Sequence, residues 1–200
     1  AVKPQVMGDA CADLREIIAE RQPMVISIAA GVTVANLREW LGDAPIVRCM
    51  PNTPALVQAG ATGLFAAEGV SEEQKAMAGQ ILSAVGLTFW FEEEKELDAV
   101  TAVSGSGPAY FFLLMESLID AAVAQGLDAA TARQMVLQTA WGAAQLAITS
   151  EAGPEILRQR VTSPGGTTAA ALGVFEEAGF REQVQAAVAA ARERSEELAE

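Results

Sequence analysis

The chain has 200 residues, with 13 Lys and Arg against 26 Asp and Glu, so its formal net charge is −13. This acidic balance argues against a nucleic-acid or anionic-membrane surface, because such polyanions would be repelled over most of the exterior. The sequence contains no histidine, which excludes imidazole acid–base catalysis, Ser-His-Asp triads and histidine-ligated metals. We expect no metal site.

Two cysteines, Cys11 and Cys49, are too few for a disulfide framework and have no CxxC spacing. Tolerated or buried thiols in a reducing compartment are therefore expected. No run approaches the ~18 uninterrupted apolar residues of a membrane span. The first residues lack the basic start and apolar stretch of a signal peptide. These features predict a soluble cytoplasmic protein with no membrane partner.

Residues 1–95 alternate helical and β-rich segments. The predicted helices lie at residues 13–20, 34–41 and 72–85, and the predicted strands at 24–30, 45–50, 62–67 and 87–91. Ser71 and Gln74 form a predicted capping box, and Met77, Ile81 and Val85 are expected to face inward. Strands and helices in alternation, joined by short links, indicate a doubly wound α/β sheet.

Sheets of this kind that bind dinucleotides open with a strand, a glycine-rich turn and a helix. The sequence has no G-x-G-x-x-G, and it starts on what resembles the tail of a strand. We expect the chain to begin in mid-domain, with the first mononucleotide-binding half largely absent. Residues 1–95 are then the C-terminal part of a dinucleotide-binding, Rossmann-like domain.

Residues 96–200 are predicted to be entirely helical. Residues 108–125 form a helix that is apolar on more than one face, which indicates burial all round and a partner subunit that supplies one wall. Further helices are predicted at 129–149, capped by Asp128, and at 154–160. The predicted core positions of the later helices are Met135, Val136, Leu146, Ile148, Phe180, Val184, Val188 and Ala191.

The predicted fold class is therefore α/β plus all-α. A partial Rossmann-like sheet domain, residues 1–95, precedes an all-helical domain for substrate binding and dimerisation, residues 96–200. The acidic run at residues 92–94 marks the expected boundary.

The segment at residues 161–172 carries the clearest chemical signal. Ser163 is expected to cap a helix, with Pro164 at its first position. Gly165 and Gly166 would then lie in the first turn of the helix, where each glycine lowers helix stability by ~1 kcal/mol. That cost is explained if a carboxylate or phosphate binds free N–H groups there, beside the hydroxyls of the two threonines that follow. The alternative is an ordinary turn between helices.

Other segments support a ligand site less strongly. Residues 50–54 follow a strand's carboxyl end, where open α/β sheets bind ligands, but could be a rigid turn. The glycines of residues 104–108 and the small residues 29–31 allow close approach by a ligand, or close packing of helices and strands. Lys3 could meet a phosphate or ribose, although an isolated lysine usually faces water. Glu94 lies in an acidic run, and most members of such a run only face water.

Five segments together resemble the pyrroline-5-carboxylate reductase family in order and rough spacing; they are residues 1–4, 27–32, 48–54, 102–110 and 163–168. The resemblance covers the whole chain, and the last two motifs are specific. It implies the reduction of 1-pyrroline-5-carboxylate to L-proline with NADPH or NADH, the last step of proline biosynthesis. Imine reduction needs a cofactor and an oriented substrate but no nucleophile or metal, so a chain without histidine suits it.

The resemblance also implies residue roles and a homodimer, or a larger homo-oligomer, formed through the helical domain. Thr168 is the expected catalytic residue, its hydroxyl bonded to the ring nitrogen, and Glu94 would favour the iminium cation. The amides of Gly166, Thr167 and Thr168 would hold the substrate carboxylate. The expected substrate-binding residues are Glu94, Ser106, Gly165, Gly166, Thr167 and Thr168. The expected cofactor-binding residues are Val2, Lys3, Pro4, Ala29, Ala30 and Asn52.

The sequence departs from the family pattern at its N-terminus, since the family's glycine-rich phosphate turn would lie upstream of Ala1. The choice between NADPH and NADH is therefore not fixed by the sequence.

Two alternatives stay open. The first is another cyclic-imine or hydroxyacid reductase on the same architecture, although a β-hydroxyacid dehydrogenase would carry a catalytic lysine on its long helix and residues 108–125 contain none. The second is an inactive fragment that acts only as a helical dimerisation module. Titration with NADPH separates the enzyme from the module.

Overall fold

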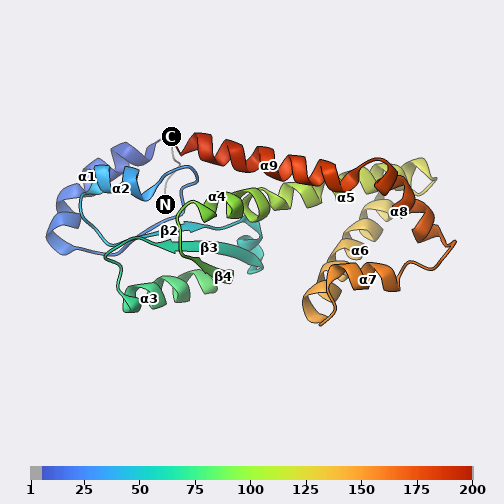
Figure 1. Ribbon diagram of the computed structural model, residues 1–200, viewed down its shortest axis with the longest axis horizontal. Helices are drawn as coiled ribbons and strands as arrows, with labels where there is room; N and C mark the ends of the chain where they lie inside the picture. Colours follow the sequence, from blue (N-terminus) through green and yellow to red (C-terminus); the bar gives the residue numbers. More distant parts are fainter. Residues whose placement is uncertain (1–5, 200) are drawn as a thin grey trace. The chain divides into compact units, whose positions relative to one another are not determined.

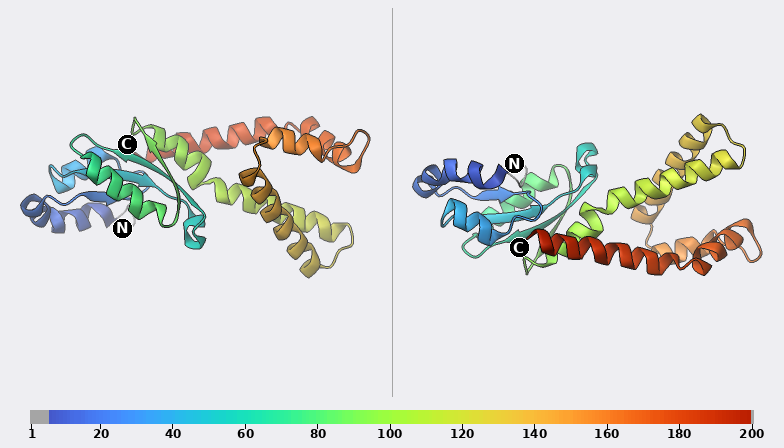
Figure 2. Two further views of the ribbon diagram at one scale, coloured as in Figure 1. Left: turned by 90° about the horizontal axis from the view of Figure 1, so that it is seen from below. Right: turned by 90° about the horizontal axis from the view of Figure 1, so that it is seen from above.

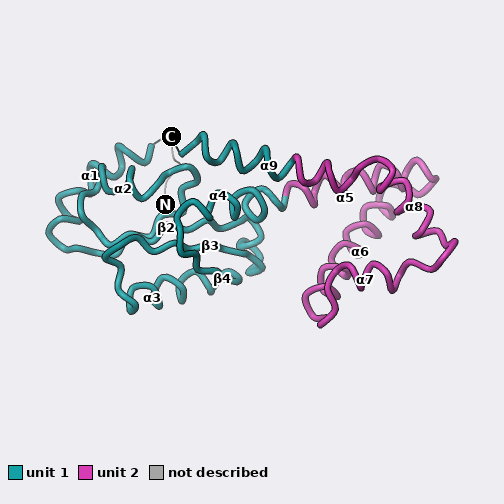
Figure 3. Tube along the Cα trace, viewed as in Figure 1, with its two compact units in different colours: residues 1–108, 187–200 teal, residues 109–186 magenta. Residues whose placement is uncertain are grey.

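The computed structural model describes residues 6–199 of the chain, which divides into two compact units (Figure 3). Unit 1 comprises Ala1–Pro108 together with Ala187–Glu200, and unit 2 comprises Ala109–Ala186. The units therefore do not follow the expected boundary at residues 95 and 96. The first unit extends 13 residues further, to Pro108, and it also includes the C-terminal residues of the chain, Ala187–Glu200.

Unit 1 contains a sheet of four strands within the described residues (Figure 1). Their order is β1 (Val25–Ser27), β2 (Ile46–Met50), β3 (Gly60–Ala66) and β4 (Gly86–Phe91). The β1–β2 and β3–β4 pairs are parallel, whereas β2 and β3 are antiparallel. The expected α/β sheet is confirmed, with one antiparallel step that the sequence pattern did not indicate.

The length of each connection explains these directions. Helices α2 (Val34–Leu41) and α3 (Glu72–Ser83) return the chain between the parallel strands. Between β2 and β3 lies only the short 3₁₀ helix η2 (Thr53–Val57). A parallel pair needs a crossover of a dozen or more residues, so this short link favours an antiparallel pair.

Two apolar clusters hold helices on both faces of the sheet. One joins α1 (Met7–Arg21) and α2 to Ile46, and the other joins α3 to Val47 and Leu64. Cys49 belongs to the second cluster, and burial raises the pKa of its thiol to about 12. Cys11 is likewise buried and free. The expectation of buried, unpaired thiols is thus confirmed.

The capping box that opens α3 is also confirmed. The backbone N–H of Gln74 donates to Ser71 Oγ at 3.2 Å, and Ser71 N–H donates to Gln74 Oε1 at 2.9 Å. The buried face of α3 differs by one position from the expected one, which comprised Met77, Ile81 and Val85. Ala78 and Leu82 are buried, whereas Met77 and Ile81 are half-exposed, because one residue rotates a helix by about 100°.

Beyond β4 the described chain is helical (Figures 1 and 2). The elements are α4 (Glu96–Val100), the π-helix η3 (Thr101–Gly105), α5 (Gly107–Ala124), α6 (Ala129–Thr149), α7 (Pro154–Arg160), α8 (Thr167–Glu177) and α9 (Phe180–Leu198). Asp128 caps α6 as expected, since its carboxylate accepts from Thr131 N–H at 3.0 Å.

The apolar helix α5 is not buried within one chain. In α5, which lies wholly in the described part, Gly107 is the only buried residue, and Phe111 and Phe112 are 64% and 62% exposed. The same holds for predicted core positions of the later helices. Met135, Leu146 and Ile148 of α6 are exposed, and so are Phe180 and Val184 of α9. An apolar surface of this kind marks a place where another molecule binds.

The continuous helix Glu96–Ala124 is long and apolar enough to cross a bilayer, judged by length and composition alone. The sequence criterion of an uninterrupted apolar run did not detect it. The same length and composition also occur in core helices of soluble proteins.

We predict that Ser71→Ala lowers the free energy of unfolding by about 1 kcal/mol, because α3 loses its N-terminal cap. Urea denaturation measures the difference. Ser83→Ala is the matched control, since this exposed serine ends the same helix and bonds only to Gln80 O at 2.9 Å. Equal effects of the two substitutions would contradict the capping role.

Candidate active site

The carboxyl ends of β1 and β2 meet at one edge of the sheet, because these strands are parallel and Ser27 lies opposite Arg48. Open α/β sheets bind ligands at such an edge. Residues 28–33, which we call the β1–α2 loop, leave from this edge. Ala29 is buried and its N–H donates to Ser27 Oγ at 3.4 Å, whereas Ala30 is exposed.

Of the residues predicted to line the cofactor cleft, Ala30 therefore presents its side chain to solvent. The methyl group of Ala29 belongs to the core, so Ala29 offers a ligand only its backbone. Val2, Lys3 and Pro4 lie outside the described residues.

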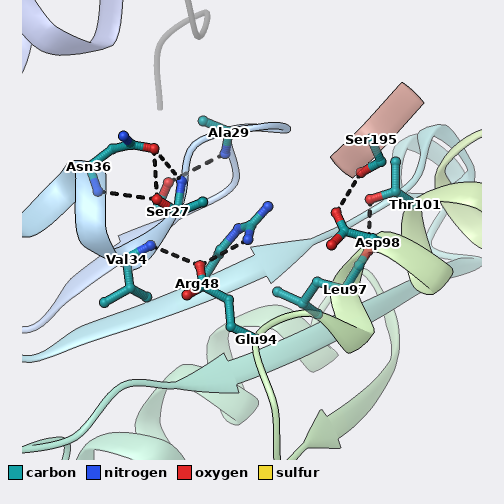
Figure 4. A network of polar contacts seen from close by, with 11 residues as sticks. Ser27, Ala29, Val34, Asn36, Arg48, Glu94, Leu97, Asp98, Thr101 and Ser195 are labelled. Carbon is teal, nitrogen blue, oxygen red and sulfur yellow. Dashed lines mark hydrogen bonds and ion pairs between the residues drawn. The ribbon is translucent and has the colours of Figure 1, made fainter. Parts of the chain in front are cut away.

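Glu94 lies in the turn between β4 and α4 and joins α2 to β2 (Figure 4). Its Oε1 accepts from the backbone N–H of Val34 at 2.8 Å and from Arg48 Nη1 at 2.9 Å. Val34 opens α2, where a carboxylate is stabilised by the free amides and the helix dipole. Arg48 lies on β2 with its side chain only 6% exposed, so its charge requires this partner.

Sequence reasoning missed Arg48 as part of this junction. A signal was available, because Arg48 is the single charged residue in an otherwise apolar predicted strand, residues 45–50. A charge in a buried strand needs a partner of opposite charge.

Asn52 joins the end of β2 to β3 and η3. Its Oδ1 accepts from Ala61 N–H at 3.0 Å, and its Nδ2 lies 3.0 Å from Ser104 Oγ and 3.3 Å from Ser104 O. Pro108 has no N–H, so it cannot donate to the carbonyl four residues earlier, that of Ser104. The Asn52 amide donates to this carbonyl. This side chain, predicted to bind cofactor, is thus used to hold the backbone.

Ser106 lies directly after the π-helix, and its N–H donates to Thr101 O at 2.8 Å. Single turns of π-helix occur frequently at functional sites. The side chain of Ser106 is half-buried.

In unit 2, the expected helix start at Ser163 and Pro164 is wrong. Gly166 N–H donates to Ser163 O at 3.0 Å, and Gly165 has a φ of +70°. Proline second and a positive-φ glycine third are typical of a type II turn. Gly166 is the N-cap, and α8 begins at Thr167. The two glycines therefore serve a turn before the helix rather than its first turn.

This turn changes which amides can bind an anion. Gly166 N–H, expected to hold a carboxylate, is used within the turn. The N–H groups of Thr167 and Thr168 have no hydrogen-bond partner among the described residues, as is usual for the first turn of a helix. Thr168 is half-buried and Thr167 is exposed. The start of α8 thus offers two adjacent amides and two hydroxyls.

Comparison with known proteins identifies the family. A family model described as pyrroline-5-carboxylate reductase dimerisation matches residues 94–198. Pyrroline-5-carboxylate reductase of Pseudomonas aeruginosa is 54% identical over 201 residues, covering 100% of this chain and 73% of the relative. The chain belongs to the pyrroline-5-carboxylate reductase family. The reductase of Haemophilus influenzae is 43% identical to this chain. The match covers 99% of this chain and 73% of the relative.

Solved structures of pyrroline-5-carboxylate reductases have the same fold. The Coxiella burnetii protein has a TM-score of 0.94 at 47% identity, over 100% of this chain and 74% of that one. The Plasmodium falciparum protein, solved with NADP bound, has a TM-score of 0.90 at 35% identity, over 100% of this chain and 80% of that one. The predicted fold class and the family resemblance are both confirmed.

The match to a dimerisation model also accounts for the exposed apolar helices. Residues 94–198 include α5 and α6, whose apolar side chains one chain leaves uncovered. Dimerisation through the helical part, expected for this pyrroline-5-carboxylate reductase relative from its sequence, is confirmed.

We predict that Asn52→Asp destabilises the protein by about 2 kcal/mol, because a carboxylate keeps the bond from Ala61 N–H but places negative charge against the Ser104 carbonyl. Chemical denaturation measures the loss. Thr53→Ala, an exposed neighbour, is the control and should stay within about 0.5 kcal/mol of the wild type. A fully stable Asn52→Asp variant would show that the Ser104 carbonyl does not need this donor.

Proposed function

We propose that this protein reduces 1-pyrroline-5-carboxylate to L-proline with NAD(P)H, the last step of proline biosynthesis. The observation that carries the proposal is the 54% identity to the Pseudomonas aeruginosa reductase over the whole chain. The two segments that we single out, the β1–α2 loop and the turn before α8, lie within that match. The Coxiella burnetii reductase supports the proposal through its fold.

The β1–α2 loop fits a nicotinamide cofactor. It follows the carboxyl end of a parallel strand, and its small exposed Ala30 leaves room for a flat ring. The NADP-bound Plasmodium falciparum relative supports the same cofactor class here. When bound, NAD(P)H supplies the hydride that the C=N carbon of the pyrroline receives. We assign Ala29 and Ala30 to the cofactor, and Val2, Lys3 and Pro4 on the family resemblance alone.

We also assign Asn52 to cofactor binding, but through the backbone rather than by direct contact. Because its amide group is bonded to Ala61 and Ser104, its contribution is to fix the turn after β2.

The start of α8 fits the substrate's carboxylate. The free N–H groups of Thr167 and Thr168 are suited to an anion at a helix N-terminus, and the turn formed by Gly165 and Gly166 presents them. The hydroxyl of Thr168 then forms a hydrogen bond with the ring nitrogen, the atom whose charge changes during reduction. Orientation and hydrogen bonding are the whole contribution of these residues.

Two residues of unit 1, Ser106 and Glu94, remain proposed substrate contacts on the family resemblance. The Oε1 atom of Glu94 already accepts from Val34 and Arg48. Any effect of Glu94 on the iminium cation would therefore come from its other carboxylate oxygen.

We further propose a cytoplasmic location. The support is the pair of buried free thiols, Cys11 and Cys49, which suits a reducing compartment.

The proposal predicts that the full-length protein oxidises NADPH or NADH when 1-pyrroline-5-carboxylate is added and forms L-proline. Chromatography of the product measures the reaction. The keto acids that a hydroxyacid reductase would convert to hydroxyacids serve as the competing substrate class. Reduction of a keto acid without reduction of the pyrroline would favour a different reductase, and no cofactor binding at all would favour a dimerisation module.

We predict that Thr168→Ala lowers kcat/KM for the pyrroline by about 10²-fold, the scale of one lost hydrogen bond in the transition state. Steady-state kinetics measure the change. Thr131→Ala is the matched control, because Thr131 is an exposed threonine in the first turn of α6. A loss of less than a few-fold for Thr168→Ala would remove this hydroxyl from the mechanism.

A further inference from the structure

The end of α9 lies against the β1–α2 loop within unit 1. Gly31 in this loop has a φ of +74°, and a Cβ added to it would lie 3.0 Å from Leu198 O and 3.1 Å from Leu198 Cβ. Glycine is therefore needed at this position both for the backbone conformation and for the close approach of Leu198. On either side of Gly31 and Ala30, the side chains of Ala29 and Val32 are buried in the core.

A buried hydrogen bond fixes the position of this last turn. Ser195 Oγ donates to Asp98 Oδ1 at 2.7 Å, and the two residues are 5% and 7% exposed (Figure 4). Ser195 is the only buried residue of α9, all of which lies in the described part. A hydroxyl-to-carboxylate bond is stronger than a neutral one. Because Ser195 precedes Leu198 by three residues, about one turn, this bond also fixes Leu198 on the loop.

The same short segment of chain fixes the other end of the loop. Glu94 accepts from Val34 N–H, directly after the loop, and Asp98 holds the turn of α9 that contacts Gly31. Residues 94–98 are themselves linked by the bond from Leu97 N–H to Glu94 O, at 3.0 Å. Two carboxylates, four residues apart, thus hold the middle and the end of one loop.

We propose that residues 195–198 of α9 are a positioning element for the cofactor. They act through Gly31, by keeping the β1–α2 loop in the conformation that receives NAD(P)H. The inference rests on the proposed function, which assigns this loop to the cofactor. Asp98, Ser195 and Leu198 are positioning residues and bind neither cofactor nor substrate themselves.

The first test is the Ser195→Ala variant of the full-length protein. The KM for NADPH should rise about tenfold, the scale of one lost hydrogen bond to a charged group. The kcat at saturating NADPH and the KM for the pyrroline should stay within about twofold, since the loop is reordered once cofactor is bound. Ser195→Thr, which keeps a hydroxyl, should restore the KM, and Ser83→Ala, at an exposed position of α3, should leave it unchanged.

A second variant avoids leaving Asp98 buried without its partner. A chain that ends at Glu197 keeps the Ser195–Asp98 bond but removes Leu198 from the loop, and it should raise the KM for NADPH in the same way. An unchanged KM for NADPH in both variants would overturn the inference. A lower kcat with unchanged KM would also overturn it, because it would show a merely structural role.

Direct titration of NADPH by fluorescence separates the inference from the proposed function. If the wild type binds NADPH but does not reduce the pyrroline, the proposed reaction fails, and a weaker Kd for NADPH in both variants still supports the positioning role. Equal Kd values in the wild type and the variants would overturn that role. A wild type that binds no NADPH would overturn the positioning role and the cofactor assignment together.

Discussion

The rest of the structure depends on the apolar surface of α5 and α6, which a single chain cannot bury. Phe111, Phe112 and Leu113 are each more than 60% exposed, and exposure of so much apolar side chain to water is unfavourable. The family model that covers residues 94–198 describes a dimerisation segment. A second copy of the chain is therefore part of the fold of unit 2, and the start of α8 belongs to that same unit.

Unit 1 is organised differently. It has a buried apolar core, and a few polar side chains fix the positions of its backbone segments. Glu94 binds Arg48 and the first amide of α2, and Asn52 donates to the carbonyl of Ser104. Asp98 holds the end of α9. Each bond fixes a segment near the carboxyl ends of the parallel strands, where a cofactor is expected. Backbone geometry at this edge is thus set by residues that need not touch a ligand.

Local signals in the sequence were sufficient for most helices and strands. The capping residues Ser71 and Asp128 and the apolar run that became β2 each depend on neighbours a few residues away, and a pattern can detect such neighbours. The family resemblance was also visible, because its motifs are short and contiguous. Fold class and family could therefore be predicted from the sequence.

Features that depend on distant residues could not be predicted. The bond between Asp98 and Ser195 joins positions 97 residues apart, and no local pattern marks either of them. The position of α8 was misjudged because Ser163 and Pro164 suit a helix start as well as they suit a turn. The positive φ of Gly165 decides between the two, and glycine alone does not reveal its φ.

Sedimentation velocity over a range of dilutions, combined with circular dichroism, tests the central claim that a second copy completes the helical fold. We expect a dimer or a multiple of dimers at all concentrations where the helical signal is native, with loss of helix on dissociation. A monomer that keeps its full helical signal and unfolds cooperatively would contradict it.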